Sequence, residues 1–159
     1  MSGTNQLVVF TLDDKQYSLS LTDVERVVRA VEITHLPAAP DFILGVINLE
    51  GRVIPVVDTR KRLGLPAREI ELEDRFIIVN HLGNTFALVA DQVKPVMEVS
   101  EQEIVSSDEL MQGTGFVGSV VKLEEGMIMT LKMDRTLPFD EYGRLSIGTT
   151  RPDEGNHAR

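Results

Sequence analysis

The sequence G-V-I-N-L-E-G-R-V-I-P-V-V-D, from Gly45 to Asp58, carries the clearest structural signals in the chain. Two apolar runs within it flank a link from Asn48 to Gly51. Asn and Gly tolerate positive φ, so the link predicts a tight hairpin turn between two strands. Proline cannot donate a hydrogen bond to a β-ladder, so we expect Pro55 at a sheet edge or at a bulge.

A short helix is predicted directly after this hairpin, over Thr59–Leu63. Asp58 precedes it, and aspartate caps helix N-termini by accepting hydrogen bonds from backbone amides. Gly64 and then Pro66 follow, a combination that ends helices. The helix carries the basic cluster Arg60-Lys61-Arg62, which we expect to be balanced within the molecule by Asp58 and by the acidic stretch Glu69–Glu73.

Short strands are predicted elsewhere in the chain. Leu7–Leu12 is apolar, and Tyr17–Leu21 alternates strictly between polar and apolar residues, as a strand with one wet face does. Thr22–Arg29 spaces its valines in a way compatible with a helix, whereas their β-branching disfavours one, so both alternatives stay open here. Ile33–Pro40 is expected to be extended because its prolines bias the preceding residues away from helix. Ser100–Glu103 has a capping-box pattern that predicts a brief helix.

The second half of the chain repeats the first at a distance of about 70 residues. The aligned segments are Arg75–Val79 with the first strand, Phe86–Val89 with Tyr17–Ser20, and Phe116–Asp134 with Phe42–Asp58. A repeat built from short strands and turns predicts two similar small barrels in tandem. Each half alone would have a thin core, so we expect the two halves to pack together.

Composition excludes several classes of function. The 159 residues carry a formal charge of −9, which disfavours binding to nucleic acid or to an anionic membrane surface. The chain has no cysteine, so it holds neither a disulfide nor a cysteine-based metal site. Met1–Gln6 is polar, and no apolar run approaches the roughly 18 residues that span a bilayer. We therefore expect a cytoplasmic protein without direct membrane insertion.

No catalytic, cofactor or metal site is predicted. Gly113-Thr-Gly115-Phe-Val-Gly118 matches the dinucleotide-binding pattern, but it lacks the preceding buried strand and the following helix that the motif requires. His35, His81 and His157 are scattered, whereas zinc needs several convergent ligands. A nucleotide-binding enzyme using the Gly113 loop is the rival hypothesis from another functional class. It predicts dinucleotide binding that is lost when Gly113 is replaced.

Two apolar clusters occupy equivalent positions in the two halves of the repeat. They are Val24, Val27 and Val28 in the first half, and Val93, Val96 and Met97 in the second. Their positions leave two alternatives open. These side chains belong to the core, or they line a shared groove for an apolar helix of a partner.

The chain resembles the CheW family of chemotaxis coupling proteins from about Leu7 to Leu137. The motifs that carry the resemblance are L-P-A-A-P at Leu36–Pro40, G-V-I-N-L-E-G at Gly45–Gly51, I-P-V-V-D at Ile54–Asp58, F-A-L-V-A-D-Q-V at Phe86–Val93, and F-V-G at Phe116–Gly118. Their order and spacing make the resemblance specific.

The resemblance implies an all-β fold of two intertwined five-stranded SH3-like barrels with short helices. We expect a CheW-like domain over residues 7–142, with one subdomain at about 16–74, a second at about 75–137, and strands crossing between them. Residues 143–159 are expected to form a flexible tail.

The implied function is that of a non-catalytic adaptor. It would dock the regulatory domain of a CheA-type histidine kinase onto the cytoplasmic tip of chemoreceptors, and it would be a monomer in isolation that is recruited to receptor arrays. A scaffold of an alternative chemosensory pathway, with changed partners, is the other hypothesis. The residues that the resemblance assigns to partner binding are Val24, Arg26, Val27, Val28, Glu50, Gly51, Val93 and Val96.

The sequence departs from the family pattern at charged positions. The family usually has Glu at position 26 and Arg at position 50, and the two commonly pair, whereas this chain has Arg26 and Glu50. We expect the two side chains to pair here with their signs exchanged, and to affect partner choice more than stability. Lys132 also stands where an acidic residue is usual.

Overall fold

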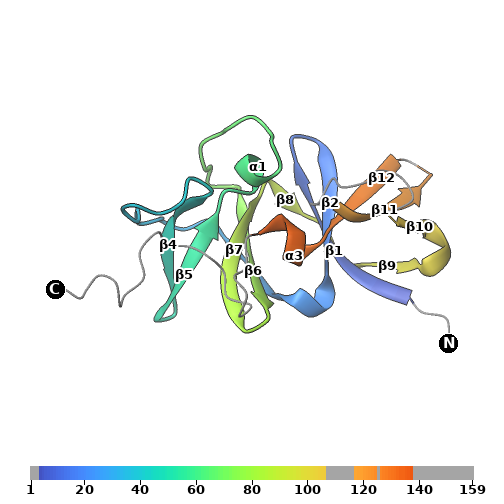
Figure 1. Cartoon of the computed structure of the whole chain (residues 1–159), viewed down its shortest axis with the longest axis horizontal. Coiled ribbons are helices and arrows are strands. Elements are labelled where there is room, and N and C mark those ends of the chain that lie inside the picture. The colour runs from blue at the N-terminus through green and yellow to red at the C-terminus, as the bar shows by residue number, and fades with distance from the viewer. Residues whose placement is uncertain (1–3, 107–116, 125, 138–159) are drawn as a thin grey trace.

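The computed structural model describes residues 4–106, 117–124 and 126–137, and these residues form two β-sheets (Figure 1). The five-stranded sheet has the order β3 (Val24–Arg29), β6 (Arg75–His81), β7 (Asn84–Ala90), β5 (Arg52–Val57) and β4 (Ile43–Leu49). The seven-stranded sheet has the order β10 (Ile104–Ser106), β11 (Val117–Leu123), β12 (Gly126–Leu131), β2 (Lys15–Ser20), β1 (Thr4–Leu12) and β8 (Gln92–Val93), with β9 (Met97–Ser100) also paired to β1. The expected all-β class is confirmed.

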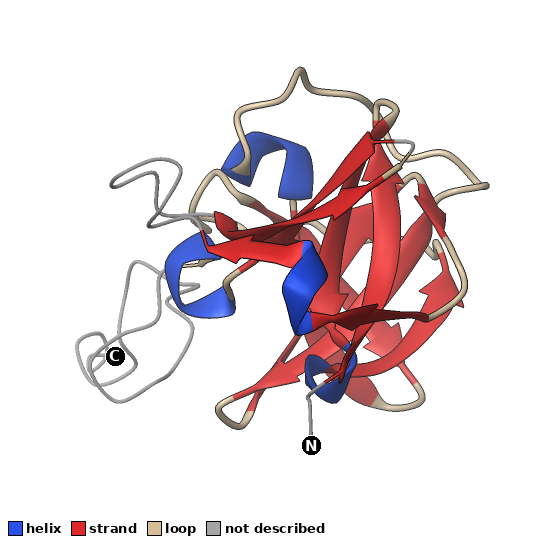
Figure 2. Ribbon diagram, turned by 90° about the vertical axis from the view of Figure 1, so that its right-hand side faces the viewer, coloured by secondary structure: helices blue, strands red, loops and turns tan. Residues whose placement is uncertain are grey.

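Helices in the described residues are single turns, three of them between strands and one after β12 (Figure 2). They are η1 (Leu21–Asp23), α1 (Thr59–Arg62), η2 (Glu101–Glu103) and α3 (Met133–Thr136). The predicted helix after the hairpin is confirmed as α1. The Asp58 side chain accepts a hydrogen bond from the Lys61 backbone N–H at 3.1 Å, and Gly64 follows the helix with a φ of +75°. The predicted turn at Ser100–Glu103 is confirmed as η2.

The predicted hairpin is confirmed as the antiparallel pair of β4 and β5. Glu50 and Gly51 form its turn, and both have positive φ, as a type I′ turn requires. The Asn48 side chain accepts a hydrogen bond from the Gly51 N–H at 2.9 Å. In the order of the sheet, β5 lies between β4 and β7. Pairing of β5 with β7 begins only at Val56, so among the described residues Pro55 has no partner on that side and lies at a local edge, which is one of the two alternatives expected. The bulge alternative is wrong, because Pro55 pairs in regular register with Val46 and the irregularity of β4 lies between Ile43 and Gly45.

The segment with the open assignment, Thr22–Arg29, is mainly the strand β3 rather than a helix, and only its first two residues belong to the single turn η1. The strand pairs antiparallel with β6, and its side chains alternate between exposed and partly buried. Three β-branched valines in six residues suit a pleated, half-buried strand better than a helix, and this preference decides the structure.

Each sheet combines strands from both halves of the sequence repeat. The β1–β2 hairpin pairs with β9 and β12, which come from the second half. Equivalently, the β6–β7 hairpin pairs with β3 and β5, which come from the first half. The two halves thus exchange hairpins, as expected for intertwined barrels. The subdomains, expected at about 16–74 and about 75–137 with strands crossing between them, stay a prediction.

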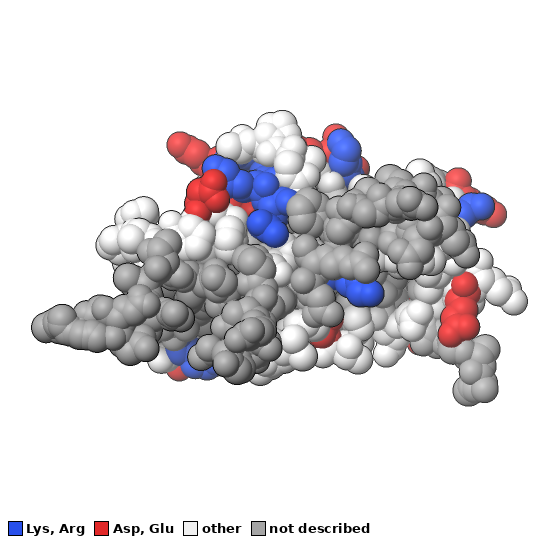
Figure 3. All heavy atoms as spheres, viewed as in Figure 1, with Lys and Arg blue, Asp and Glu red and all other residues white. Residues whose placement is uncertain are grey.

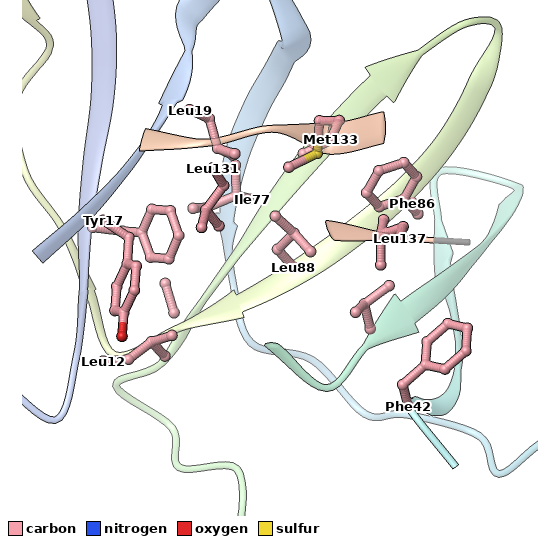
Figure 4. Close-up of a cluster of buried hydrophobic side chains, with 14 of the residues drawn as sticks. Leu12, Tyr17, Leu19, Phe42, Ile77, Phe86, Leu88, Leu131, Met133 and Leu137 are labelled. Carbon is pink, nitrogen blue, oxygen red and sulfur yellow. The ribbon is translucent and has the colours of Figure 1, made fainter. Parts of the chain in front are cut away.

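A shared core joins the two sheets (Figure 4). Its largest cluster includes Leu12, Tyr17 and Leu19 from one sheet and Ile77, Phe86 and Leu88 from the other, with Phe42, Leu131, Met133 and Leu137 completing it. All of these side chains are buried. The expectation that the two halves pack together is confirmed, because neither sheet could bury these side chains alone.

The five-stranded sheet closes where the chain beyond β3 returns to β4. The backbone N–H of Thr34 donates to the Val46 carbonyl at 2.8 Å, and the N–H of Val46 donates to the Thr34 carbonyl at the same distance. These bonds connect the chain that continues from one outer strand, β3, to the other outer strand, β4, so the sheet closes into a barrel. Gly45 lies at the closure with a φ of +152°.

Candidate partner-binding surface

Two crossed ion pairs join β3 to the β4–β5 turn. Arg26 binds both carboxylate oxygens of Glu50, with Nη2–Oε1 at 2.9 Å and Nη1–Oε2 at 3.3 Å. Arg52 binds Glu25 in the same two-pronged way, at 2.7 and 3.1 Å. The expected contact between Arg26 and Glu50 is therefore confirmed. The contact between Glu25 and Arg52 was not predicted.

The local backbone explains how neighbouring residues of a strand join one surface cluster. Successive side chains of a regular strand point to opposite faces. Here the register of β3 against β6 shifts between Val24 and Arg26, so Glu25 is an extra residue in the ladder. A β-bulge re-aims side chains in this way. It allows Glu25 and Arg26 both to reach the turn at residues 50–52.

The ion pairs keep these surface groups charged. A hydrogen bond from Arg26 lowers the pKa of Glu50, and a hydrogen bond from Arg52 lowers the pKa of Glu25. A depressed carboxylate pKa means that the pairing persists to a pH below the ordinary titration range of glutamate. Because the four side chains keep between 30% and 71% of their surface exposed to water, the cluster contributes more to charge pattern than to stability.

The apolar residues expected to bind partners fall into two groups. Val24 and Val93 pack against the shared core cluster, and Val28 packs against a second cluster inside the five-stranded barrel. Val27 and Val96 are exposed, at 37% and 49% of their surface. Gly51 is exposed in the turn beside Glu50. Of the five valines, only Val27 and Val96 offer a substantial apolar surface to a partner.

A second charge network lies at the junction of the two sheets and is mostly buried. Arg60 of α1 is only 6% exposed, and its Nη2 contacts Asp13 at 2.9 Å and Asp91 at 2.7 Å. Arg68 contacts Asp91 at 2.6 Å and Asp74 at 2.9 Å. The balance of Arg60 within the molecule was predicted, but the predicted partners, Asp58 and Glu69–Glu73, are wrong. Asp13 and Asp91 are far from Arg60 in sequence and come together only through the fold.

The other basic residues of α1 have separate roles. Arg62 donates to the Thr136 carbonyl at 2.6 Å, and its guanidinium lies 5.1 Å from the centre of the Phe42 ring. Lys61 is exposed and lies 3.9 Å from Asp41. Basic side chains gather over α1, with acidic side chains beside them (Figure 3). This part of the surface is therefore locally balanced despite the net negative charge of the chain.

In the described part of the chain, no three His, Asp or Glu side chains are grouped so as to hold a metal ion. His81 lies beside Asp23 at 3.4 Å. The Gly113 and Gly115 positions, His157 and the 143–159 tail lie outside the described residues. Within residues 4–106, 117–124 and 126–137, no helix has the length and apolar character needed to cross a bilayer.

Comparison with known proteins identifies the family. The model of the CheW-like domain matches residues 6–141. The chain belongs to the CheW-like family. It is 34% identical to the chemotaxis protein CheW of Bacillus subtilis over 134 residues, which cover 83% of this chain and 86% of that protein. It is 28% identical to CheW of Rhizobium meliloti over 142 residues, which cover 88% and 92% of the two chains.

A solved structure extends the match to three dimensions. The scaffolding protein TtCheW from Thermoanaerobacter tengcongensis superposes with a TM-score of 0.79 and 34% identity, covering 93% of this chain and all of that one. The expected CheW-like fold of two SH3-like barrels is therefore correct. The expected five strands are found in one sheet, whereas the other has seven, with both β8 and β9 paired to β1. Within this fold Arg26 and Glu50 form an ion pair, and Glu25 and Arg52 form a second ion pair beside it.

Proposed function

We propose that this chain is a non-catalytic adaptor that couples a CheA-type histidine kinase to chemoreceptors. The observation that carries the proposal is the CheW-like family match, which spans nearly the whole folded chain. The similarity to CheW proteins along most of both chains supports the same function. Such an adaptor would work in the cytoplasm and be recruited to receptor arrays at the membrane.

We assign the partner contacts to the surface around β3 and the β4–β5 turn, and to the segment around Val93 and Val96. The exposed side chains of Val27 and Val96 would contribute apolar contacts, and Arg26, Glu50 and Gly51 would contribute charge and shape. The partly buried valines would contribute indirectly, because they pack against the core and so fix the position of the surface strands; they are Val24, Val28 and Val93. The two partners would be the helical cytoplasmic tip of a receptor and the regulatory domain of the kinase.

The function is tested by capture from the native cell. A tagged form of the full chain is used to purify partners from lysate, and the partners are identified by mass spectrometry. Recovery of both a CheA-type kinase and a chemoreceptor is expected. Recovery of neither, from cells that express both, would contradict the proposal.

Exchanging the signs of the 26–50 pair is expected to alter partner binding. Either Arg26→Glu or Glu50→Arg places like charges opposite each other, and we expect each to weaken binding of the kinase or the receptor by about tenfold. The double variant restores an ion pair and should recover part of the loss. The measurement is titration of the purified partner by calorimetry.

The control for Arg26→Glu is Lys61→Glu, which makes the same change of charge at an exposed site on α1. It should leave binding nearly unchanged if local pairing matters rather than net charge. A double-mutant cycle in which the two substitutions simply add would show that the pair has no role in binding. A changed identity of the captured kinase or receptor, rather than weaker binding, would favour the alternative hypothesis of a separate chemosensory pathway.

A further inference from the structure

A groove opens where the chain of β3 runs past the end of its neighbour β6. The last backbone bond between the two segments runs from the Ala30 N–H to the Asp74 carbonyl, at 3.1 Å. Beyond it, residues 31–33 and residues 70–72 form two separate walls. The space between them has a volume of about 460 Å³ and is lined by Ala30, Val31, Glu32, Ile33, Ile70, Glu71 and Leu72.

The groove is apolar at its base, and its rim combines exposed apolar side chains with acidic ones. Ala30, Ile33 and Ile70 pack against the core cluster of the five-stranded barrel. Leu72 exposes 86% of its surface and Val31 exposes 44%. A single exposed apolar side chain needs no explanation, but two that flank an apolar groove are typical of an interaction site.

The wall at residues 31–33 also offers unused backbone groups. Within the described residues, Val31, Glu32 and Ile33 form no backbone hydrogen bond, although Ala30 and Thr34 on either side do. The segment thus resembles the free edge of a sheet, which pairs readily with another extended chain. Backbone pairing of this kind supplies affinity, and adjacent pockets select alternate side chains of the bound segment.

The charges at the groove indicate the kind of segment that fits. The two charged residues that line it, Glu32 and Glu71, are both acidic, and Glu69 and Glu73 are exposed next to them. Arg68 partly neutralises Glu71 at 3.0 Å, whereas Glu32 has no ion pair among the described residues. A basic segment would therefore complement this rim, and an acidic one would be repelled.

The second wall is held in place before anything binds. The Asp74 side chain accepts hydrogen bonds from the Glu71 N–H at 2.8 Å and from Arg68 at 2.9 Å. Arg68 is anchored in turn by Asp91. A wall fixed by the buried charge network loses little conformational entropy on binding, which favours affinity.

We propose that this groove binds an extended segment of a partner protein, in which apolar side chains alternate with Lys or Arg, as an added strand along residues 31–33. The proposal rests on the groove alone and does not depend on the proposed adaptor function. It adds a linear-peptide contact to a molecule whose other expected contacts are with folded partners.

The test uses a capped synthetic heptapeptide in which Lys alternates with Leu and Val, and full-length protein labelled for NMR. Binding is expected to shift the amide signals of residues 30–33 and 70–72. Because backbone N–H groups of an extended segment point alternately to its two edges, hydrogen exchange should slow at alternate residues, either at Glu32 or at both Val31 and Ile33. Leu72→Ser and Glu32→Lys should each weaken binding by about tenfold. Leu82→Ser, which changes another apolar and exposed residue on the β6–β7 turn, should not.

Two matched peptides distinguish strand addition from non-specific hydrophobic or electrostatic binding. A peptide with methylated backbone nitrogens on the pairing edge keeps its side chains but loses its donors, so it should bind much more weakly. A peptide with Glu in place of Lys should not bind. Equal binding of the methylated peptide, or no binding of the parent at millimolar concentration, would overturn the proposal. So would self-association of the protein that Leu72→Ser abolishes, since a second copy would then occupy the groove.

Discussion

Replacing Gly45 by alanine is expected to reduce the free energy of unfolding by about 3 kcal/mol. A Cβ atom at this position would lie 2.2 Å from the Thr34 carbonyl oxygen and 2.8 Å from Cγ2 of Ile33. Relief requires the chain at Thr34 to move away from β4, which breaks the two backbone bonds that close the barrel. The φ of +152° adds strain for any side chain. Urea unfolding followed by circular dichroism measures the loss.

Gly126 provides the matched control for this substitution. Its φ is +154°, almost the same as that of Gly45, but a Cβ atom there would meet nothing within 4 Å. Gly126→Ala therefore introduces the same backbone strain as Gly45→Ala but no steric clash. We expect it to reduce the free energy of unfolding by about 1 kcal/mol. If the two variants are equally destabilised, the close approach of Thr34 is not the reason for glycine at position 45.

Local patterns in the sequence were sufficient to predict the local structures. The turn at Glu50 and Gly51, the Asp58 cap and the Ser100–Glu103 turn each depend on residues within a few positions of one another. Side-chain chemistry and backbone preference act at this range, so the pattern and the structure correspond. The internal repeat also allowed the two-barrel architecture to be predicted, because equivalent strands in the two halves occupy equivalent positions in the two sheets.

Features that depend on distant residues were not visible in the sequence. Nothing near Arg60 indicates that Asp13 and Asp91 will surround it, since hairpin exchange between the two halves brings them together. The bulge at Glu25 is set by the register of β3 against β6, which the pattern of valines does not fix. The Arg26–Glu50 contact could be predicted only through the resemblance to a family.

Asp91→Asn is expected to reduce the free energy of unfolding by about 3 kcal/mol at neutral pH. The substitution keeps the size of the side chain and an oxygen that can accept the Asp13 N–H, which now donates to Asp91 at 2.9 Å. It removes the charge that faces both Arg60 and Arg68. Arg60 is nearly completely buried, so it cannot turn to water, and Asp13, which is 41% exposed, is the only carboxylate in contact with it that the variant retains among the described residues. Thermal and urea unfolding at pH 7 measure the effect.

The comparison with Glu50→Gln shows why burial determines this cost. Both substitutions neutralise a carboxylate that faces arginine, but Glu50 and Arg26 are exposed and water replaces the lost contact. Glu50→Gln should therefore leave the urea midpoint almost unchanged. If the two variants lose equal stability, the Arg60–Asp91–Arg68 network is no stronger than a surface pair.

The pH dependence of the Asp91→Asn effect gives an independent check. Burial of Asp91 opposes its ionisation, but the Asp13 N–H and the guanidiniums of Arg60 and Arg68 outweigh burial and lower the pKa of the carboxyl. A folded-state pKa below the unfolded value, about 3.9 for aspartate, gives stability that is present above that value and is lost as the pH falls through the folded-state pKa. The difference between wild type and Asp91→Asn should thus stay constant from pH 7 to about pH 5 and shrink below about pH 4. A difference that persists unchanged into strong acid would mean that the substituted amide perturbs packing, and that the charge of Asp91 is not what holds the two sheets together.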